Sequence, residues 1–296
     1  MKIGVVDIDS KIPNLALMKL SAHHKQKGHE VELTSPLFAD QYDMIFASKV
    51  FDYTPMPILP ECSIVGGSGI SLKIELDKPI ESLKPDYNLY PDTTYSLGFT
   101  TRGCIRKCPF CIVPEKEGKL RVVADIHQIW NGKDRDVVLL DNNILGLPDH
   151  FFKITTQIKE LKLKVDFNQG LDHRLLTKDV SRRLSEISHV RYRFAFDDIR
   201  HEKNVLKALR TLREVGINIS FWYVLVGFNS TLEEDFYRIN LLRGHNQDVY
   251  VQRYNYRQER IYLLMAQWAN QHHIFRTHTW NQFLEKRGVR EGVVLT

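Results

Sequence analysis

The sequence predicts an α/β protein, in which a small Rossmann-like α/β domain precedes a partial barrel of six βα units. Apolar runs of strand length alternate with longer segments that carry apolar residues at helical spacing. From residue 95 onward the alternation repeats at about 30 residues per unit, the length of a βαβ element. Six prolines between residues 55 and 91 interrupt the pattern, and the last three of them predict a linker between two domains.

The first domain is expected at residues 1–92. The apolar run Ile3–Ile8 is typical of a buried strand, and Asn14–Lys27 carries apolar residues at helical spacing until Gly28 ends the helix. Further strands are predicted at 31–33, 44–47 and 63–65. Because strands and helices alternate along the chain, we expect these strands to form a parallel sheet.

The barrel is expected at residues 93–256. Its predicted strands are Tyr95–Thr100, Val137–Asp141, Lys164–Asn168, Tyr192–Phe196, Ile219–Val226 and Val249–Arg253. A helix is predicted after each of the first five strands, and the last of these helices begins with a capping box of Ser230 and Glu233. Residues 257–296 are expected to form a C-terminal helical extension that packs a closing helix against the barrel.

Composition places the chain in the cytoplasm. The longest apolar stretches, such as Phe221–Phe228, are of strand length and fall short of the roughly 20 residues that span a bilayer. The N-terminus becomes charged too early for a secretory signal. Three of the four cysteines lie within eight residues, which favours a metal over disulfides. The formal net charge of +5 permits an acidic partner such as RNA without arguing for one.

The cysteine cluster carries the chemistry. Cys104, Cys108 and Cys111 have the spacing C-x3-C-x2-C. Three thiolates on one loop can each bind a different iron of a 4Fe–4S cluster and leave the fourth iron without a protein ligand. That iron can chelate the amino and carboxylate groups of S-adenosylmethionine (SAM), and an electron passed to the sulfonium then releases a 5′-deoxyadenosyl radical. A structural zinc site is the alternative, and it needs a fourth ligand such as His127.

This spacing, placed after the first barrel strand and with Phe110 before the last cysteine, resembles the radical SAM superfamily. The resemblance runs from Tyr95 to about Asn255, about 160 residues, and implies a 4Fe–4S cluster, SAM and a radical SAM partial barrel. It also implies that Phe110 lies beside the adenine. The whole chain is similar to uncharacterised bacterial and phage radical SAM proteins that have a truncated cobalamin-binding-like N-terminal domain. The stretches that match them are 13–19, 139–143, 166–172 and 224–230.

Polar residues after the second and third barrel strands are candidate SAM ligands. Asp141, Asn142 and Asn143 stand where the family often has a glycine-rich acidic motif for the SAM amino group, and this sequence lacks those glycines. The alternative is a turn that Asp141 caps. Arg174 is expected to pair with the SAM carboxylate, since guanidinium binds carboxylates bidentately. The alternative is an ion pair of Arg174 with Asp172 or Asp179 that fixes a loop.

Four further polar residues are candidates to hydrogen-bond the SAM ribose or the substrate, and one glycine is a candidate to approach the adenine. Gln169 and Asp172 follow the third strand, and Asp197 and Asp198 follow the fourth, where one of the two is expected only to cap the next helix. Gly227 matches the position where the family's backbone approaches the adenine; the alternative is a plain turn glycine.

The N-terminal domain argues against cobalamin. Cobalamin-dependent relatives ligate cobalt through a histidine in a loop that aligns with Asp7–Pro13, and this loop has none. Gly66–Gly69 resembles a phosphate loop only weakly, because glycine-rich turns are common. Cys62 is expected to be buried as a small hydrophobe, and a role as a thiol nucleophile or radical relay is the alternative.

Two functions follow from these patterns. The first is a radical SAM enzyme of unknown substrate, supplied with electrons by a donor such as flavodoxin or ferredoxin. The second is a metal-containing nucleic-acid-binding or tRNA-modifying protein. It is suggested by the interleaved basic and aromatic residues of 253–257, with Arg260 and Tyr262, a pattern typical of single-strand binding. Arg102, Arg106 and Lys107 are expected either to ease electron entry at the cluster or to form a solvated basic loop.

Overall fold

The computed structural model describes residues 1–289 and confirms an α/β protein with parallel sheets. The chain falls into two compact units. The first comprises residues 1–142 with 160–164, and the second comprises 143–159 with the chain from 165 onward. The predicted domain limits at residues 92 and 256, and the closure of a barrel, stay predictions. Within residues 1–289 no helix is both long and apolar enough to cross a bilayer.

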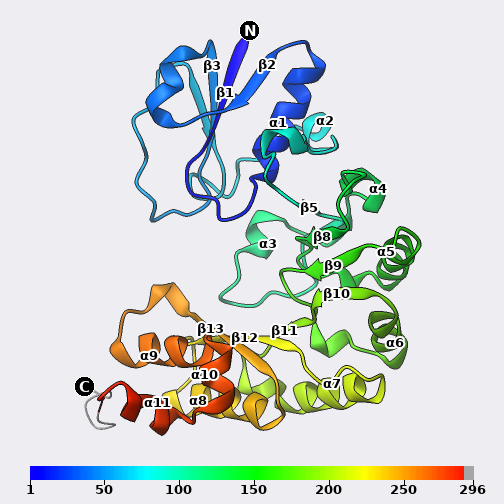
Figure 1. Ribbon diagram of the computed structural model, residues 1–296, viewed down its shortest axis with the longest axis vertical. Coiled ribbons are helices and arrows are strands. Elements are labelled where there is room, and N and C mark those ends of the chain that lie inside the picture. The colour runs from blue at the N-terminus through cyan, green and yellow to red at the C-terminus, as the bar shows by residue number, and fades with distance from the viewer. Residues whose placement is uncertain (290–296) are drawn as a thin grey trace. The chain divides into compact units, whose positions relative to one another are not determined.

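The first unit opens with a parallel four-stranded sheet in the order β2-β1-β3-β4 (Figure 1). Its strands are β1 (Lys2–Asp7), β2 (Glu30–Leu33), β3 (Met44–Ser48) and β4 (Ser63–Gly66). Helix α1 (Leu15–Gln26) packs against the sheet and is capped by the buried Asn14, whose side chain accepts the N–H of Leu17 at 3.2 Å. The strands and the helix lie where the sequence predicts them. The 3-10 turn η1 (Pro36–Gln41) joins β2 to β3.

The same unit continues beyond the proline-rich segment without a break in its core. Leu89 and Leu97 belong to one buried cluster with Ile3 and Met18. Strand β5 (Tyr95–Gly98) pairs in parallel with β8 (Asp136–Leu139). Short elements complete the unit: α2 (Lys78–Glu81), η2 (Tyr87–Leu89), β6 (Thr101–Arg102), α3 (Val113–Lys116), β7 (Arg121–Val122) and α4 (Ile126–Ile129). The helix predicted around residues 126–130 is therefore a single turn.

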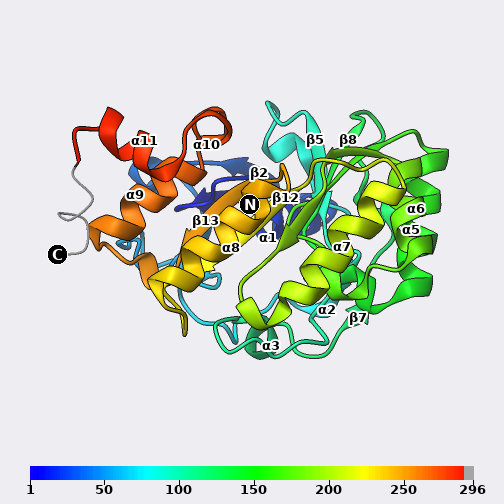
Figure 2. The same cartoon turned by 90° about the horizontal axis from the view of Figure 1, so that it is seen from below.

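The second unit contains the later strand and helix repeats. Strand β9 (Lys164–Phe167) neighbours β10 (Ser188–Arg191), and β11 (Arg193–Ala195), β12 (Phe221–Val226) and β13 (Asp248–Arg253) form a parallel sheet. The helices are α5 (Pro148–Glu160), α6 (Lys178–Glu186), α7 (Glu202–Glu214) and α8 (Leu232–Gly244), with the 3-10 turns η3 (Ile144–Gly146), η4 (His173–Leu175), η5 (Ile199–His201) and η6 (Tyr254–Tyr256). Figure 2 shows α7 and α8 side by side along one face of this sheet.

The two faces of the β11–β13 sheet differ in chemistry. Phe194 and Trp222 stand side by side on the helix-covered face, where both are fully buried. On the opposite face Tyr223 lies beside Tyr250, which is 41% exposed, and Arg193 donates to the Tyr223 hydroxyl at 3.1 Å. This alternation is what a sheet covered by helices on one side requires.

Two predictions about local structure are wrong. The capping box of α8 is formed by Thr231 and Glu234, one residue later than predicted, and Ser230 instead donates to Asp235. Cys62 is exposed and not buried. The predicted C-terminal extension contains three helices within the described residues, namely α9 (Arg260–Ala269), α10 (His272–Thr277) and α11 (Trp280–Lys286). The last part of the predicted extension, residues 290–296, lies outside the described residues.

Candidate functional site

The three clustered cysteines lie on a closed loop of the first unit, residues 102–122, which we call the cysteine lobe. Strands β6 and β7 pair antiparallel and join the two ends of the lobe. Gly103 has a φ of +82°, and a side chain there would lie 2.5 Å from the carbonyl oxygen of Lys119. Only glycine fits such a close crossing of two backbones. The lobe therefore has a tight neck directly before Cys104.

The thiols suit an iron–sulfur cluster in their chemistry. Cys104, Cys108 and Cys111 are half-buried and free of disulfides. The N–H of Arg106 points at the Cys104 sulfur at 3.3 Å, the kind of contact that tunes a cluster thiolate, and the N–H of Cys111 bonds the Cys108 carbonyl at 3.0 Å. Across residues 1–289, no three His, Cys, Asp or Glu side chains already converge as a set of metal ligands. The ligand assignment consequently rests on spacing and donor type.

Asp141 and Asn142, two of the predicted SAM ligands, hold the entry to the lobe. The buried Asp141 carboxylate accepts both hydroxyls, of Thr100 at 2.7 Å and of Thr101 at 2.6 Å, as well as both backbone N–H groups of these threonines. Asn142 accepts the N–H of Gly103 at 3.0 Å. Burial raises the pKa of Asp141. Asp141 and Asn142, in the turn after β8, thus fix Thr100, Thr101 and Gly103, which precede Cys104.

Arg102 is neither solvated nor a free positive charge. Its guanidinium donates to Glu117 at 3.0 and 3.1 Å and to Glu81 at 2.7 Å, and it lies 4.0 Å from the ring centre of Phe99. Lys19 pairs with the same Glu81 at 2.9 Å. Since Glu117 stands near the far end of the lobe, the Arg102–Glu117 pair closes the loop a second time. The alternative of a solvated basic loop is wrong for this residue.

In the second unit, several predicted site residues form one network. Arg174 donates to both oxygens of Asp172, at 2.7 and 3.2 Å, and Asn143 donates to Asp172 at 3.2 Å. His201, which the sequence did not single out, lies 3.3 Å from Arg174. The loop-fixing Arg174–Asp172 pair is therefore present. The guanidinium that Arg174 would offer to a ligand carboxylate is paired with the carboxylate of Asp172.

The two aspartates after β11 have different roles. Asp197 accepts the N–H of Leu225 on the adjacent strand at 2.9 Å, and its loss of hydration raises its pKa. Asp198 accepts the N–H of Arg200 at 2.9 Å and pairs with the Arg200 side chain, which lowers the pKa of Asp198 to about 2. Asp198 caps the 3-10 turn η5, in line with the expectation that one of the two aspartates caps the element that follows.

The backbone at Gly227 is closely approached by another part of the protein, and the side chain concerned is that of Arg257. Gly227 has a φ of +74°, and an added side chain would lie 2.7 Å from Arg257. Its N–H donates to Asp235 at 3.0 Å, and Asp235 pairs with Arg238 at 2.5 Å, both completely buried. Arg238 also donates to the carbonyl oxygens of Phe196 and Leu225, at 2.6 and 2.8 Å. This buried pair fixes the ends of β11 and β12 together with the Gly227 turn.

The sequence patterns did not reveal a second ion pair, which joins strands β9 and β11. Arg193 on β11 donates bidentately to Asp166 on β9 at 2.5 and 2.6 Å and to the Tyr223 hydroxyl at 3.1 Å. The available signal was a charged residue inside each of two apolar strands, because buried charges are normally paired. Gln169, the remaining predicted ligand, is exposed.

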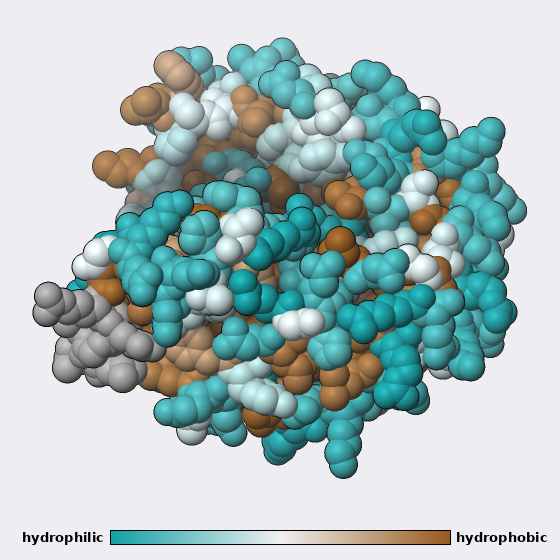
Figure 3. Space-filling model, turned by 60° about the horizontal axis from the view of Figure 1, so that its bottom comes forward, coloured by the Kyte–Doolittle hydropathy of each residue, from teal (hydrophilic) through white to brown (hydrophobic). Residues whose placement is uncertain are grey.

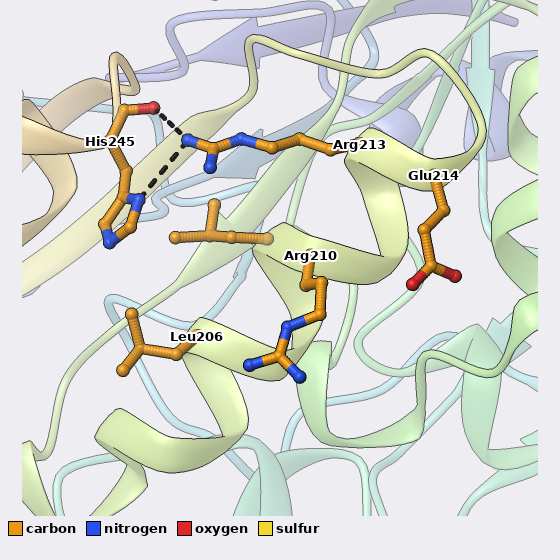
Figure 4. Close-up of a pocket in the computed structure, with 6 residues that line it drawn as sticks. Leu206, Arg210, Arg213, Glu214 and His245 are labelled. Carbon is orange, nitrogen blue, oxygen red and sulfur yellow. Dashed lines mark hydrogen bonds between the residues drawn. The ribbon is translucent and has the colours of Figure 1, made fainter.

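A surface pocket lies away from all these residues. It has a volume of about 460 Å³ and is lined by Leu206, Arg210, Arg213, Glu214 and His245 of α7 and the end of α8 (Figure 4). Arg213 donates to the His245 carbonyl at 2.9 Å and spans the pocket edge. Figure 3 views this side of the protein and shows hydrophilic side chains with hydrophobic ones scattered between them. No predicted site residue lines the pocket.

The basic and aromatic segment 253–257 is used within the fold. Arg253 donates to the Arg257 carbonyl at 2.6 Å, and Arg257 bonds the Gly227 carbonyl at 3.0 Å and pairs with Glu259 at 2.7 Å. Tyr262 is buried. These contacts stabilise the chain between the end of β13 and the start of α9.

Comparison with known proteins gives two weak similarities, and no model of a protein family matches the chain. A tRNA-2-methylthio-N(6)-dimethylallyladenosine synthase of Hydrogenobaculum sp. (strain Y04AAS1) is 23% identical over 252 residues, 76% of this chain and 56% of that protein. A CDK5RAP1-like protein of Oryza sativa subsp. japonica is 22% identical over 143 residues, 46% of this chain and 23% of that protein. The chain therefore spans about half the length of the first relative and less of the second. These similarities point to the radical SAM superfamily, the one that the cysteine spacing resembles.

Proposed function

We propose that this chain is a radical SAM enzyme, in which Cys104, Cys108 and Cys111 hold a 4Fe–4S cluster. The observation that carries the proposal is the C-x3-C-x2-C spacing on a loop whose neck is fixed by Gly103 and the Arg102–Glu117 pair. When bound, the cluster and SAM supply a 5′-deoxyadenosyl radical. We further propose that the βα repeats form the partial barrel typical of the superfamily.

The protein's own residues supply position. Asp141 and Asn142 hold the backbone from Thr100 to Gly103, so the three sulfurs start from a fixed point. Phe110 is assigned to the adenine side of SAM on the basis of the family resemblance alone. Asn143, Asp172, Arg174, Asp197, Gln169 and Gly227 remain proposed contacts for SAM or substrate. For Arg174 this role requires that a ligand carboxylate replace or join Asp172, with which it is already paired.

Anaerobic reconstitution tests the proposal. The wild-type chain is expected to bind about four iron and four sulfide ions, to turn brown, and to form 5′-deoxyadenosine from SAM when a reductant is added. Cys108→Ala is expected to lose both iron and product. Cys62→Ser is the matched control, because Cys62 is an exposed free cysteine outside the lobe. Zinc in place of iron, or full SAM cleavage by Cys108→Ala, would refute the assignment.

A tRNA substrate is the second candidate to test. It is favoured by the similarity to a tRNA-modifying synthase over 76% of this chain. Incubation of the reconstituted protein with bulk tRNA, SAM and reductant, followed by nucleoside mass spectrometry, is expected to reveal one mass-shifted nucleoside. Cys108→Ala with the same tRNA provides the control. SAM cleavage without any change in the nucleosides would remove tRNA and leave the first proposal intact.

A further inference from the structure

One face of the N-terminal sheet exposes large apolar side chains. Four of them, which we call the apolar patch, are Leu37 (88% exposed), Phe38 (55%), Met56 (43%) and Ile58 (95%). The first two belong to η1, and the other two belong to the loop between β3 and β4. Ala39 of η1 and Leu59 of the loop pack in one small core cluster with Val6 of β1. The turn and the loop therefore lie on the same face of the sheet.

This face of the sheet is thinly covered. On the other face α1 packs Leu17 and Met18 against Ile3 and Val5 of β1. Strand β2 is joined to β3 by the six-residue turn η1, at a place where a doubly wound sheet has a helix. The four side chains of the apolar patch together expose about 600 Å², at roughly 200 Å² for a fully exposed large side chain. Covering them with a second molecule would bury about 1,200 Å² in total, which is the size of a specific protein interface.

Acidic side chains accompany the apolar patch. Residues 30–61 contain six acidic side chains and one basic side chain, a net charge of −5, although the whole chain carries +5. The basic one, Lys49, is buried, whereas Asp40 on η1 and Asp52 in the loop are exposed. Two such patches facing each other would bring like charges together, which opposes binding. The charge therefore favours a partner whose apolar surface is accompanied by basic side chains.

Helix α7 presents a surface of this kind. Four basic side chains, spaced three or four residues apart and so on one face of the helix, are exposed: Lys203, Lys207, Arg210 and Arg213. The pocket of about 460 Å³ described above is lined by Leu206 and Leu209 together with both arginines (Figure 4). Glu214 is the one acid among the residues that line it. The pocket therefore combines an apolar lining with an excess of positive charge.

We propose that the apolar patch of one copy of this chain docks into the α7 pocket of a second copy. Leu37 and Ile58, the most exposed side chains of the patch, would then meet the leucines of the pocket, and Asp40 and Asp52 would face its arginines. Such a contact joins different surfaces of the two copies, so it can be repeated and forms a closed ring or a chain of copies. The inference goes beyond the proposed function and does not depend on the cluster.

Light scattering after size exclusion measures the association of the full chain. The wild type is expected to have a mass above that of one chain, and added salt is expected to lower this mass, because salt screens exposed charges. Ile58→Glu in the patch and Arg210→Glu in the pocket are each expected to weaken association by at least about tenfold. Arg182→Glu, an exposed arginine of α6 that does not line the pocket, is the matched control and should associate as the wild type does.

Mixing the two variants is the decisive measurement. Ile58→Glu keeps an intact pocket and Arg210→Glu keeps an intact patch, so their equimolar mixture is expected to form a dimer although each variant alone is monomeric. A contact of patch with patch predicts instead that Arg210→Glu alone associates like the wild type. That result overturns the proposal, as do a monomeric wild type, a mixture that stays monomeric, or loss of association by Arg182→Glu. Circular dichroism checks the fold of each variant, and the milder pair Leu37→Ser and Lys207→Ala serves if either of the first two unfolds.

Discussion

Replacing Arg238 by methionine tests the role of the buried ion pair in the second unit. Arg238 and Asp235 are both fully buried, and their atoms approach to 2.5 Å. Arg238→Met keeps much of the apolar stem but leaves the Asp235 carboxylate in the core without a counterion. It also removes the donors to the carbonyl oxygens of Phe196 and Leu225. Breaking a buried pair from one side typically costs about 3–5 kcal/mol.

The expected loss is large enough to measure directly. For a unit of this size it corresponds to a fall of about 10 °C in melting temperature. Urea unfolding followed by tryptophan fluorescence reports it, because Trp222, Trp268 and Trp280 lie in the second unit. Trp222 is fully buried and lies beside Phe194.

The double variant Asp235→Leu/Arg238→Met supplies the decisive comparison. Replacing both partners by apolar side chains removes the uncompensated charge, so the double variant is expected to lie within about 2 kcal/mol of the wild type. Asp235→Leu alone should be as damaging as Arg238→Met, because it strands the guanidinium. The reasoning is refuted if Arg238→Met costs less than about 1 kcal/mol, or if the double variant costs the sum of the two single changes.

Three further predictions concern other parts of the chain. Asp141→Asn is expected to lower reconstituted iron by at least about half, since the carboxylate that holds the lobe entry accounts for about 1–3 kcal/mol of hydrogen bonding. Asp136→Asn, at the start of β8, is the control, and equal iron in both variants would contradict the anchoring role of Asp141. Burial lowers the pKa of His189 to about 4, so its contribution to stability is present above pH 6.5 and is lost as the pH falls through 4. When the pH is lowered from 7 to 4, the free energy of unfolding of the wild type should therefore fall by about 2–3 kcal/mol more than that of His189→Phe. Equal shifts of the urea midpoint in the two proteins would contradict this. Thr231→Ala is expected to cost about 1 kcal/mol in thermal unfolding and Glu233→Ala close to nothing, and the opposite order would restore the earlier capping box.

The strands were predictable because their burial imposes a simple composition. Apart from Asp7 in the first and Ser220 in the second, the runs Ile3–Ile8 and Ile219–Val226 contain only glycine and aliphatic or aromatic residues, and the structure has β1 and β12 there. Strands β6 and β7 could not be found in this way, because each has two residues and two residues carry no periodicity. Their pairing depends on the crossing at Gly103, a contact between segments that local sequence does not specify.

The position of the α8 cap shows how a tertiary contact decides between equal local patterns. Ser230 and Glu233 fit the capping-box pattern as well as Thr231 and Glu234 do. The structure uses the later pair, and the Ser230 hydroxyl donates to Asp235 at 2.6 Å. Asp235 is fixed in turn by its buried pair with Arg238. The helix start is therefore set by the buried ion pair, which the sequence pattern around the cap does not reveal.

The polar residues at the strand ends stay predicted ligands, but the contacts within the protein reduce how many of them can bind a ligand directly. A carboxylate has about four acceptor positions, and Asp141 already accepts from four donors of Thr100 and Thr101. It can position a neighbour but has little capacity for SAM. Gln169 is exposed, and its side chain makes no hydrogen bond within residues 1–289.

The candidate ligands therefore differ in how many existing contacts they would have to give up on binding SAM or substrate. Gln169 can meet a ligand without giving up an existing contact, whereas Arg174 must share the guanidinium that Asp172 already holds at 2.7 Å. A carboxylate ligand that joins this pair places two negative groups on one arginine, and it is favoured only if a further cation is close. His201, 3.3 Å from Arg174, does not supply that charge, because an arginine N–H only donates and the facing nitrogen of His201 must therefore accept. Burial and the charge of Arg174 also lower the pKa of His201, which disfavours its protonated form. Arg174 is therefore expected to bind a ligand carboxylate only if the ligand displaces Asp172, whereas Gln169 needs no such exchange.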